Sequence, residues 1–214
     1  MKKLAIFDFD GTLFDSVWDV IDCFNEALTR YDFPTLTYDE YIGCLGGNID
    51  EIVSLVLKDN STPKNIEKVK RTYLELYNPS PKEKTLPFPG AHECLRNLQD
   101  KDVLLAVNSN RLDYSLNHFI DRFFADIDFV LIEGHKEDYP SKPDPYGVNR
   151  IMEKANVDLD DAVYIGDSKT DIETAKNAGV DCIIVTWGYG NQGDYGNEYN
   201  MDTVDEFDDI VKYF

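Results

Sequence analysis

The chain has 214 residues, of which 43% are hydrophobic, and it carries a formal net charge of −20. This size and apolar content allow a sizeable core in one α/β domain with an insertion, or in two small domains, while the acidic charge argues against nucleic acids and anionic membranes as partners. The apolar runs are too short to span a bilayer, and Asp8 interrupts the run that follows Lys2 and Lys3, so we expect neither a membrane anchor nor a signal peptide.

Five short apolar runs predict β-strands. They are nearly continuous in Val, Ile, Leu, Phe and Tyr rather than alternating, which is typical of parallel strands covered on both faces. Helical patterns separate the later runs, and this alternation predicts a doubly wound α/β fold with a parallel sheet and right-handed crossovers. The predicted strands cover residues 4–8, 103–107, 129–132, 162–166 and 182–186, and the predicted helices cover residues 91–100, 112–124, 145–156 and 168–179.

The interval between the first two predicted strands is far longer than an ordinary crossover. It holds four amphipathic, helix-like patterns and closes with a turn-rich stretch. We expect a small α-helical domain at residues 15–86, inserted into a core domain formed by residues 1–14 and 87–214. The alternative is that these helices simply cover one face of the sheet. Near the C-terminus, a polar loop is expected before a final helix at residues 205–214.

The stretch DFDGT at residues 8–12 ends the first predicted strand with two carboxylates. In a doubly wound sheet, ligands bind at the carboxyl ends of the strands, and Asp8 and Asp10 can both face that crevice. Gly11 permits a tight turn whose N–H groups approach an anion, and Thr12 adds a hydroxyl donor. An ordinary Asp-Gly turn at the end of a strand is the alternative.

Further polar residues follow the later strands. Ser109 and Asn110 end the second strand just before a helix, where a hydroxyl is a natural phosphate ligand, although a helix cap explains it as well. Lys142 lies in the loop SKPDP, which contains two prolines. Asp167 leaves the fourth strand, and Asp171 follows in the first turn of the next helix. The helix dipole offers a second explanation for an acidic residue at that place.

Four of these carboxylates should converge at one edge of the sheet: Asp8, Asp10, Asp167 and Asp171. Like charges at such short range are unfavourable, so the cluster requires cations. Mg²⁺ is the expected cofactor, because it prefers oxygen ligands and shares a few carboxylates with a substrate phosphate. Together with Lys142, such a site is suited to phosphoryl transfer.

The motifs, in this order, resemble those of the haloacid dehalogenase superfamily of phosphohydrolases: DFDGTL, a strand that ends in Ser-Asn, Lys-Pro and GDSKTD. The resemblance spans the whole chain and implies a Rossmann-like core. It also implies that the inserted helices are similar to the helical cap of the superfamily. GTLFDS, PFPGAHECLRNL and TWGYG support a likeness to phosphoglycolate phosphatases and their relatives.

The resemblance also implies roles for the motif residues. Asp8 would be the nucleophile that forms an aspartyl-phosphate. Asp10 would protonate the leaving oxygen and then activate water. Mg²⁺ would be held by Asp8, the backbone carbonyl of Asp10, Asp167 and Asp171. The substrate phosphate would be bound by Gly11, Thr12, Ser109, Asn110 and Lys142.

The expected reaction is hydrolysis of a small phosphorylated metabolite such as 2-phosphoglycolate. The same core also serves sugar phosphomutases similar to β-phosphoglucomutase, and pyrophosphatases, and a binding protein without catalytic activity could keep the fold. The segment CLGGNIDEIV at residues 44–53 contains neither the Arg of the mutases nor the Schiff-base Lys of phosphonoacetaldehyde hydrolases. The absence of both residues favours simple hydrolysis over the reactions of these two enzyme groups.

The cysteines are widely spaced and include no CxxC pair. This pattern predicts buried thiols in a reducing compartment rather than a zinc site or a disulfide framework. We therefore expect a cytoplasmic protein, either a monomer or a homodimer. The four thiols belong to Cys23, Cys44, Cys94 and Cys182.

Overall fold

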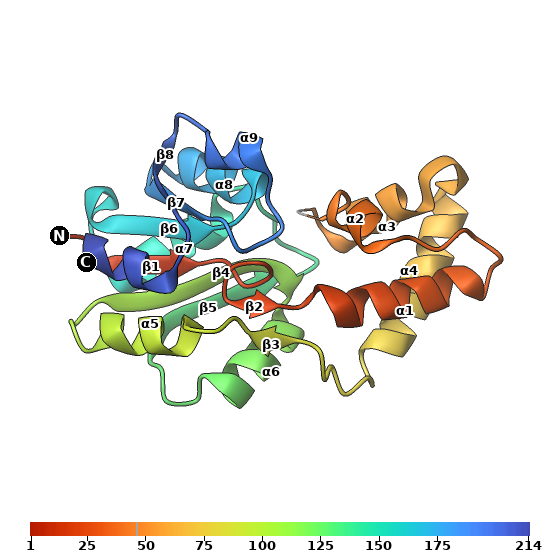
Figure 1. Cartoon of the computed structure of the whole chain (residues 1–214), viewed down its shortest axis with the longest axis horizontal. Helices are drawn as coiled ribbons and strands as arrows, with labels where there is room; N and C mark the ends of the chain where they lie inside the picture. The colour runs from red at the N-terminus through yellow and green to blue at the C-terminus, as the bar shows by residue number, and fades with distance from the viewer. Residues whose placement is uncertain (46) are drawn as a thin grey trace. The chain divides into compact units, whose positions relative to one another are not determined.

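The structure, a computed structural model, describes residues 1–45 and 47–214. The chain divides into two compact units (Figure 1). The core unit consists of Met1–Phe14 and Pro87–Phe214, and the helical unit consists of Asp15–Leu86. The assignment of these units as a core domain and an inserted helical domain stays a prediction. In the described residues, none of the helices combines the length and apolar character that crossing a bilayer requires.

A six-stranded parallel sheet forms the centre of the core unit, with strand order β5-β4-β1-β6-β7-β8. β1 lies in the interior of the sheet and pairs with β4 on one side and with β6 on the other. The predicted doubly wound fold is thereby confirmed. The strands are β1 (Leu4–Phe7), β4 (Leu104–Leu112), β5 (Phe129–His135), β6 (Ala162–Gly166), β7 (Asp181–Val185) and β8 (Asn200–Val204).

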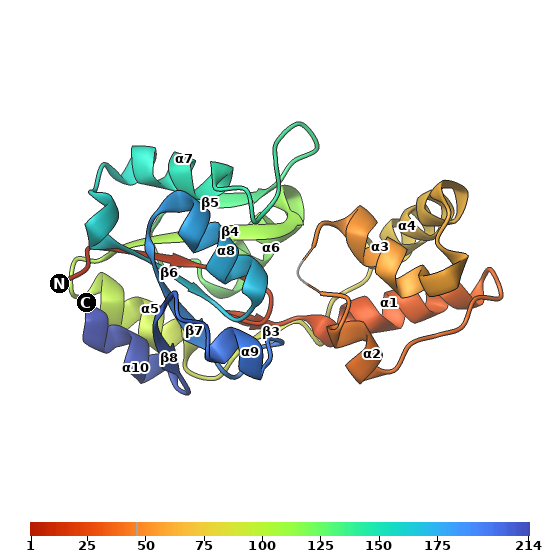
Figure 2. The ribbon, with the colours of Figure 1, turned by 90° about the horizontal axis from the view of Figure 1, so that it is seen from above.

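The interior strand β1 is buried on both faces, because helices cover both faces of the sheet. In β1, Ala5 and Phe7 join one buried cluster, and Leu4 and Ile6 join the other. Figure 2 shows α7 on one side of the sheet and α5 with α10 on the other. The helices are α5 (Ala91–Gln99), α6 (Asp113–Phe123), α7 (Tyr146–Ala155), α8 (Lys169–Ala178), α9 (Gln192–Tyr195) and α10 (Phe207–Ile210), with 3₁₀ turns η2 (Leu159–Asp161) and η3 (Val211–Tyr213).

The connections place a switch point beside β1. After β1 the chain returns as β4 and continues outward to β5, and it then crosses to the other side of β1 to form β6, β7 and β8. The loops that follow β1, β4 and β6 therefore meet at the carboxyl edge of the sheet, where doubly wound folds bind their ligands.

The C-terminal region differs from the sequence-based expectation. The polar stretch contains α9, and β8 follows it as a sixth strand that was not predicted. Only Val204 of β8 is buried, and the other four residues of this edge strand, Asn-Met-Asp-Thr, are mostly polar. It therefore lacks the continuous apolar run that marks the interior strands. The expected final helix is divided into α10 and η3.

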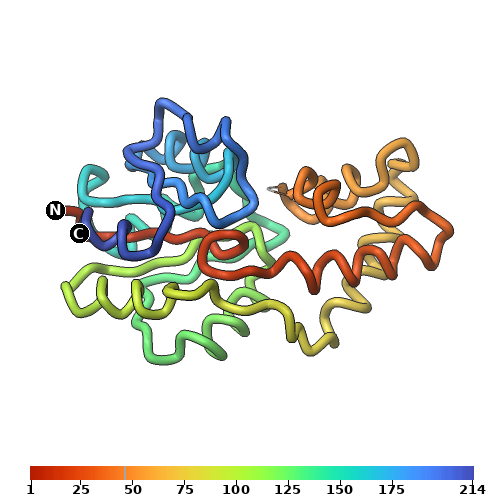
Figure 3. Tube along the Cα trace, viewed as in Figure 1, coloured from red at the N-terminus to blue at the C-terminus, as the bar shows by residue number. Residues whose placement is uncertain are grey.

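Among its described residues, the helical unit contains four α-helices, and Figure 3 traces its chain from red-orange to yellow. Their boundaries have local causes: Thr62 caps one helix with Pro63 next to it, and Asn48 and Glu51 form a capping box. Stacked rings of Phe24 and Tyr73, with centroids 4.0 Å apart, join the first and last of these helices. They are α1 (Val17–Thr29), α2 (Tyr38–Ile42), α3 (Ile49–Leu57) and α4 (Pro63–Tyr77), with 3₁₀ turn η1 (Lys58–Asn60).

Two short strands contain the points at which the chain passes from one unit to the other. They are β2 (Phe14–Asp15) and β3 (Leu86–Pro87), and they pair with each other in a separate sheet. The glycine pair at residues 46 and 47 is a candidate substrate contact or helix turn, and Gly46 lies outside the described residues.

Because the core covers both faces of the sheet, shortening a side chain should lower the free energy of unfolding more in an interior strand than in the edge strand β8. Ile183 of β7 is fully buried, whereas Met201 of β8 is 36% exposed. Ile183→Ala should lower the free energy of unfolding by about 2–5 kcal/mol, because it removes buried methylenes and leaves a cavity. Met201→Ala should change it by less than about 1 kcal/mol. Urea unfolding followed by circular dichroism measures both, and equal losses would contradict the layer assignment.

Candidate active site

Asp8 is placed by the strand that precedes it. Its N–H donates to the carbonyl oxygen of Ile165 at 2.8 Å, so pairing with β6 continues one residue beyond the end of β1. The residue is only 6% exposed. A rigid strand therefore presents this carboxylate, nearly buried, at the carboxyl edge of the sheet.

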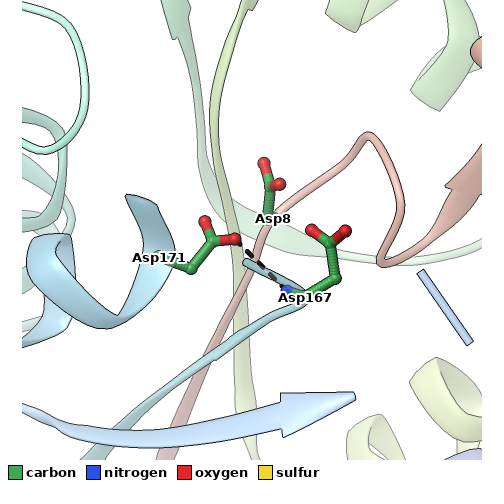
Figure 4. A group of neighbouring side chains, drawn as sticks. All are labelled: Asp8, Asp167 and Asp171. Atoms are coloured by element: carbon green, nitrogen blue, oxygen red, sulfur yellow. Dashed lines mark hydrogen bonds between the residues drawn. The ribbon is translucent and has the colours of Figure 1, made fainter. Parts of the chain in front are cut away.

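The neighbouring strand brings two further carboxylates to the same place. Asp167 follows the last residue of β6, and Asp171 lies in the first turn of α8. One oxygen from each of Asp8, Asp167 and Asp171 lies within 4.8 Å of the others (Figure 4). The structure thus brings together three of the four carboxylates that were expected to converge. The side chain of Asp10 does not belong to this group.

Lys142 provides the positive charge beside these carboxylates. Its Nζ lies 2.8 Å from Oδ1 of Asp8 and 2.7 Å from Oδ1 of Asp171. Its side chain is 6% exposed, so the ammonium group is held out of bulk water. Burial alone would lower the pKa of Lys142, yet the carboxylates of Asp171 and Asp8 raise it well above its ordinary value. The lysine is therefore a fixed cation.

One lysine does not balance three buried carboxylates. Burial raises the pKa of Asp8 to about 7 against the opposing effect of Lys142. Burial, reinforced by the charges of Asp171 and Asp8, also raises the pKa of Asp167 well above its ordinary value. Both groups therefore resist ionisation until a cation stabilises them, and oxygen ligands in a cluster of this size suit a divalent metal ion.

Asp171 also caps its own helix. Its Oδ2 accepts hydrogen bonds from the backbone N–H of Asp167 at 3.2 Å and from the N–H and hydroxyl of Ser168 at 3.1 and 3.0 Å. Its Oδ1 accepts from Lys142. Both oxygens are therefore engaged by the protein, which suits an anchoring role. Asp171 therefore both caps the N-terminus of its helix and belongs to the carboxylate cluster, so the two explanations offered for it from the sequence are compatible.

Gly11 and Tyr189 pack closely against Asp167. The N–H of Tyr189 donates to Oδ2 of Asp167 at 2.7 Å. A Cβ atom on Gly11 would lie 2.4 Å from that oxygen, and the glycine has a φ of +84°. Only a residue without a side chain leaves the Asp167 carboxylate in place. Tyr189 comes from TWGYG, a stretch to which the sequence analysis assigned no role at the site.

The predicted phosphate ligands at the end of β4 have different surroundings. Ser109 is 5% exposed, and its Oγ accepts the backbone N–H of Arg111 at 3.1 Å. Asn110 binds the backbone of Lys142 twice: its Oδ1 accepts the N–H at 2.8 Å, and its Nδ2 donates to the carbonyl oxygen at 3.1 Å. Asn110 thus holds the loop that carries Lys142, and contact with a substrate stays a prediction for both residues.

Thr12 is fully buried behind the turn that Gly11 begins. Its carbonyl oxygen accepts the indole N–H of Trp187 at 3.0 Å. Within residues 1–45 and 47–214, the structure gives its Oγ1 no hydrogen-bond partner. A buried hydroxyl without a partner is costly, so it is consistent with a ligand that supplies one. Phosphate contact by Thr12 and Gly11 stays a prediction.

Asp10 is paired with Arg111, a residue that the sequence analysis missed. Nε of Arg111 lies 3.2 and 3.1 Å from the two carboxylate oxygens of Asp10. The Asp10 side chain is 33% exposed, whereas the Arg111 side chain is 7% exposed. The available signal was the position of Arg111, directly after Ser109 and Asn110 at the carboxyl end of a strand.

Comparison with known proteins places these motifs in a family. The family model of haloacid dehalogenase-like hydrolases matches residues 5–185. A phosphoglycolate phosphatase of Aquifex aeolicus is 30% identical over 187 residues, covering 87% of this chain and 86% of that protein. A second one, from Pseudomonas syringae pv. tomato, is 27% identical over 215 residues, covering 99% of this chain and 79% of that protein.

One solved structure superposes on the whole length of this chain. A candidate phosphoglycolate phosphatase from Lactobacillus delbrueckii subsp. bulgaricus superposes with a TM-score of 0.92 at 27% identity. The match covers 100% of this chain and 98% of that protein. The similarity therefore includes the sheet and the helices at residues 15–86 alike.

The crowding at Gly11 predicts a site-specific cost for adding one methyl group. Gly179 also has a positive φ, +76°, but the nearest atom to a Cβ there is 3.9 Å away. Gly179→Ala should therefore cost only the backbone strain, about 1–2 kcal/mol. Gly11→Ala should cost about 1–3 kcal/mol more, because the methyl group displaces Asp167. Urea unfolding of both variants checks this, and equal losses would show that Gly11 is required only for its backbone conformation.

Proposed function

The chain belongs to the family of haloacid dehalogenase-like hydrolases, and we propose that it is a Mg²⁺-dependent phosphatase that hydrolyses a small phosphorylated metabolite through an aspartyl-phosphate. One observation carries this proposal: the buried carboxylate of Asp8 lies at a strand end, 2.8 Å from the ammonium group of Lys142 and within 4.8 Å of two further carboxylates. A nucleophilic oxygen and fixed positive charge at one point are what phosphoryl transfer requires.

In the first half of the proposed reaction, Asp8 is the nucleophile. A carboxylate oxygen of Asp8 forms a bond to phosphorus while the bond from phosphorus to the ester oxygen breaks. The carboxyl group of Asp10 gives a proton to the leaving oxygen, so an alcohol departs and Asp10 becomes a carboxylate. Lys142 stabilises the negative charge on the phosphoryl oxygens.

In the second half, water attacks the phosphorus of the aspartyl-phosphate. Asp10 takes a proton from that water as the new bond forms, and the Asp8 carboxylate leaves. Inorganic phosphate is released, and both aspartates return to their starting states. Ser109 and the N–H groups around Gly11 would hold the phosphoryl oxygens in both halves.

The metal is proposed to be Mg²⁺, held by the carboxylates of Asp8 and Asp167 and the carbonyl oxygen of Asp10, with Asp171 as the anchor. When bound, it neutralises charge on the phosphoryl group and on the carboxylates. The raised pKa values of Asp8 and Asp167 support this assignment, because both groups require a cation to ionise readily.

The substrate class is proposed from the relatives. Two relatives that cover most of this chain bear the name phosphoglycolate phosphatase. A small, anionic phosphate ester such as 2-phosphoglycolate is therefore the first candidate. We assign the choice among such esters to the helices at residues 15–86, as the cap of the enzyme.

Replacing the proposed nucleophile should abolish turnover. Asp8→Asn should reduce phosphate release from a panel of phosphorylated metabolites to the uncatalysed background, because an amide cannot form the aspartyl-phosphate. Asp121→Asn makes the same chemical change at an exposed position and should keep full activity. Phosphate release is measured with Mg²⁺ present, and circular dichroism checks that both variants fold.

The outcomes distinguish the candidate reactions. Full activity of Asp8→Asn would contradict the assigned nucleophile. Conversion of a sugar phosphate to its isomer without free phosphate would favour a phosphomutase. Binding of Mg²⁺ without turnover of any ester would favour a protein that has lost catalysis.

The crowded carboxylates predict a change in metal-free stability. A carboxylate whose pKa is higher in the folded state than in the unfolded state destabilises the fold when it is ionised, and this cost falls as pH drops through the folded-state pKa. Asp167→Asn removes one such charge. Without divalent cations near pH 8, the variant should therefore melt at a higher temperature than the wild type, by about 2–4 °C for each kcal/mol recovered.

Adding MgCl₂ should reverse that order. It should raise the melting temperature of the wild type by mass action and leave Asp167→Asn nearly unchanged. EDTA should stop hydrolysis by the wild type, and excess Mg²⁺ should restore it. Equal stabilisation of both proteins by Mg²⁺, or full activity in EDTA, would place the metal elsewhere or exclude a role for it.

A further inference from the structure

The guanidinium group of Arg111 holds the carboxylate of Asp10 at both oxygens. Nε donates to Oδ1 at 3.2 Å and to Oδ2 at 3.1 Å, and Nη2 also donates to Oδ1. Contact through two nitrogens fixes the plane of the carboxylate as well as its distance. Asp10 follows β1 and Arg111 lies near the end of β4, so the pair joins two neighbouring strands at the carboxyl edge of the sheet.

Arg111 is itself held from several directions. Nη1 donates to Oγ of Ser115 at 3.2 Å. The rings of Phe9 and Phe119 lie 4.9 and 5.3 Å from its Cζ, so the guanidinium group contacts two aromatic rings. Its backbone N–H donates to Oγ of Ser109. These contacts hold the arginine in place independently of its ion pair with Asp10.

Burial distinguishes this ion pair from the other arginine pairs in residues 1–45 and 47–214. Arg111 is 7% exposed at its side chain, whereas the arginines of the other pairs are 41–66% exposed. Burying a guanidinium group costs desolvation that the partner charge only offsets, so such a pair adds little to net stability. Its value is better sought in the position that it gives to Asp10.

Asp10 requires a fixed position more than other groups at the site. Its side chain is 33% exposed and does not belong to the buried carboxylate cluster. An acid and base that serves two successive proton transfers must stay within hydrogen-bond reach of the reacting oxygen. A carboxylate that rotates freely in water would meet that condition only part of the time.

We propose that Arg111 is a positioning residue that holds the Asp10 carboxylate within reach of the leaving oxygen and then of the attacking water. The inference rests on the proposed function, because it assigns Arg111 to the proton transfers of that reaction. Of the hydrogen bonds given above, Oδ1 accepts two and Oδ2 accepts one, so we assign the proton transfers to Oδ2. In this scheme Arg111 contacts Asp10, and it contacts neither the phosphorus nor the leaving and attacking oxygens.

The test separates the two halves of the reaction by the choice of leaving group. p-Nitrophenolate leaves without protonation, so formation of the aspartyl-phosphate from p-nitrophenyl phosphate depends little on Asp10. Hydrolysis of the aspartyl-phosphate still requires it. Arg111→Lys and Arg111→Met should therefore release one p-nitrophenolate per enzyme in a fast burst, followed by a steady rate about 10–100-fold below that of the wild type. General acid–base catalysis contributes about 10²–10⁴-fold in all, so a partial loss is expected.

An alkyl phosphate gives the complementary result. Because its leaving oxygen requires the proton, both Arg111 variants should lose kcat by at least as much as with p-nitrophenyl phosphate, and should show no burst. KM should change by less than about threefold. A rise in KM with kcat intact would show that Arg111 binds substrate and would overturn the proposal.

Three controls keep the test specific. Asp10→Asn should show the same burst, and Arg111→Met combined with Asp10→Asn should be no slower than Asp10→Asn alone, because the two residues act as one unit. Arg150→Met removes one of the two ion-pair partners that the structure gives Glu133, a contact of 2.6 Å elsewhere in the core unit, and should produce no burst. Losses that add in the double variant, or a burst with Arg150→Met, would overturn the proposal.

A milder variant covers the case in which both Arg111 variants fail to fold. Ser115→Ala removes one hydrogen bond of Nη1 and should give a smaller loss of kcat with the same burst. Unchanged kinetics in Ser115→Ala together with unfolded Arg111 variants would mean that Arg111 serves the fold alone. Absence of hydrolysis by the wild type would instead refute the proposed function, so the two failures are distinguishable.

Discussion

Repulsion among three buried carboxylates, countered by one buried lysine, is the constraint on which the rest of the site depends. The oxygens of Asp8, Asp167 and Asp171 lie within 4.8 Å of one another, and the Nζ of Lys142 contacts two of these residues. Perturbed carboxylates of this kind are concentrated at functional sites, which supports the proposed role of the cluster. The backbone N–H groups that bind Asp171 and Asp167, and the absence of a side chain at Gly11, all serve to keep this charge in place.

The order of the strands in the sheet is enough to bring these groups together. β1 lies between β4 and β6, so the residues after three strands share one edge of the sheet. Asp8 continues the pairing of β1, and Asn110 fixes the Lys142 loop to the end of β4 by two hydrogen bonds. The reactive groups thus lie on strands or are held to them. The pair of Asp10 and Arg111 extends the same arrangement to the acid and base of the proposed reaction.

Much of the fold and the main carboxylate cluster could be predicted from the sequence, because both rest on local patterns. Continuous apolar runs mark five of the six strands in the central sheet, whereas β8 has the sequence NMDTV, of which only Val204 is buried. DFDGT and GDSKTD each place an aspartate directly after a strand. The contact between Arg111 and Asp10 could not be predicted, because a charged residue near the end of a strand is ordinarily solvated, and only tertiary packing buries Arg111. The two hydrogen bonds of Asn110 likewise join residues far apart in the sequence.

The central claim is that the phosphoryl group of the substrate is transferred to Asp8. The most direct measurement is acid quenching of the wild-type enzyme during turnover of a phosphate ester, followed by peptide mass spectrometry of the N-terminal segment. The account predicts a phosphoryl group on Asp8 that is sensitive to hydroxylamine, as an acyl phosphate is, and that disappears when substrate is exhausted. Rapid turnover with Asp8 unmodified at every quench time, or with the phosphoryl group on another residue, would contradict it.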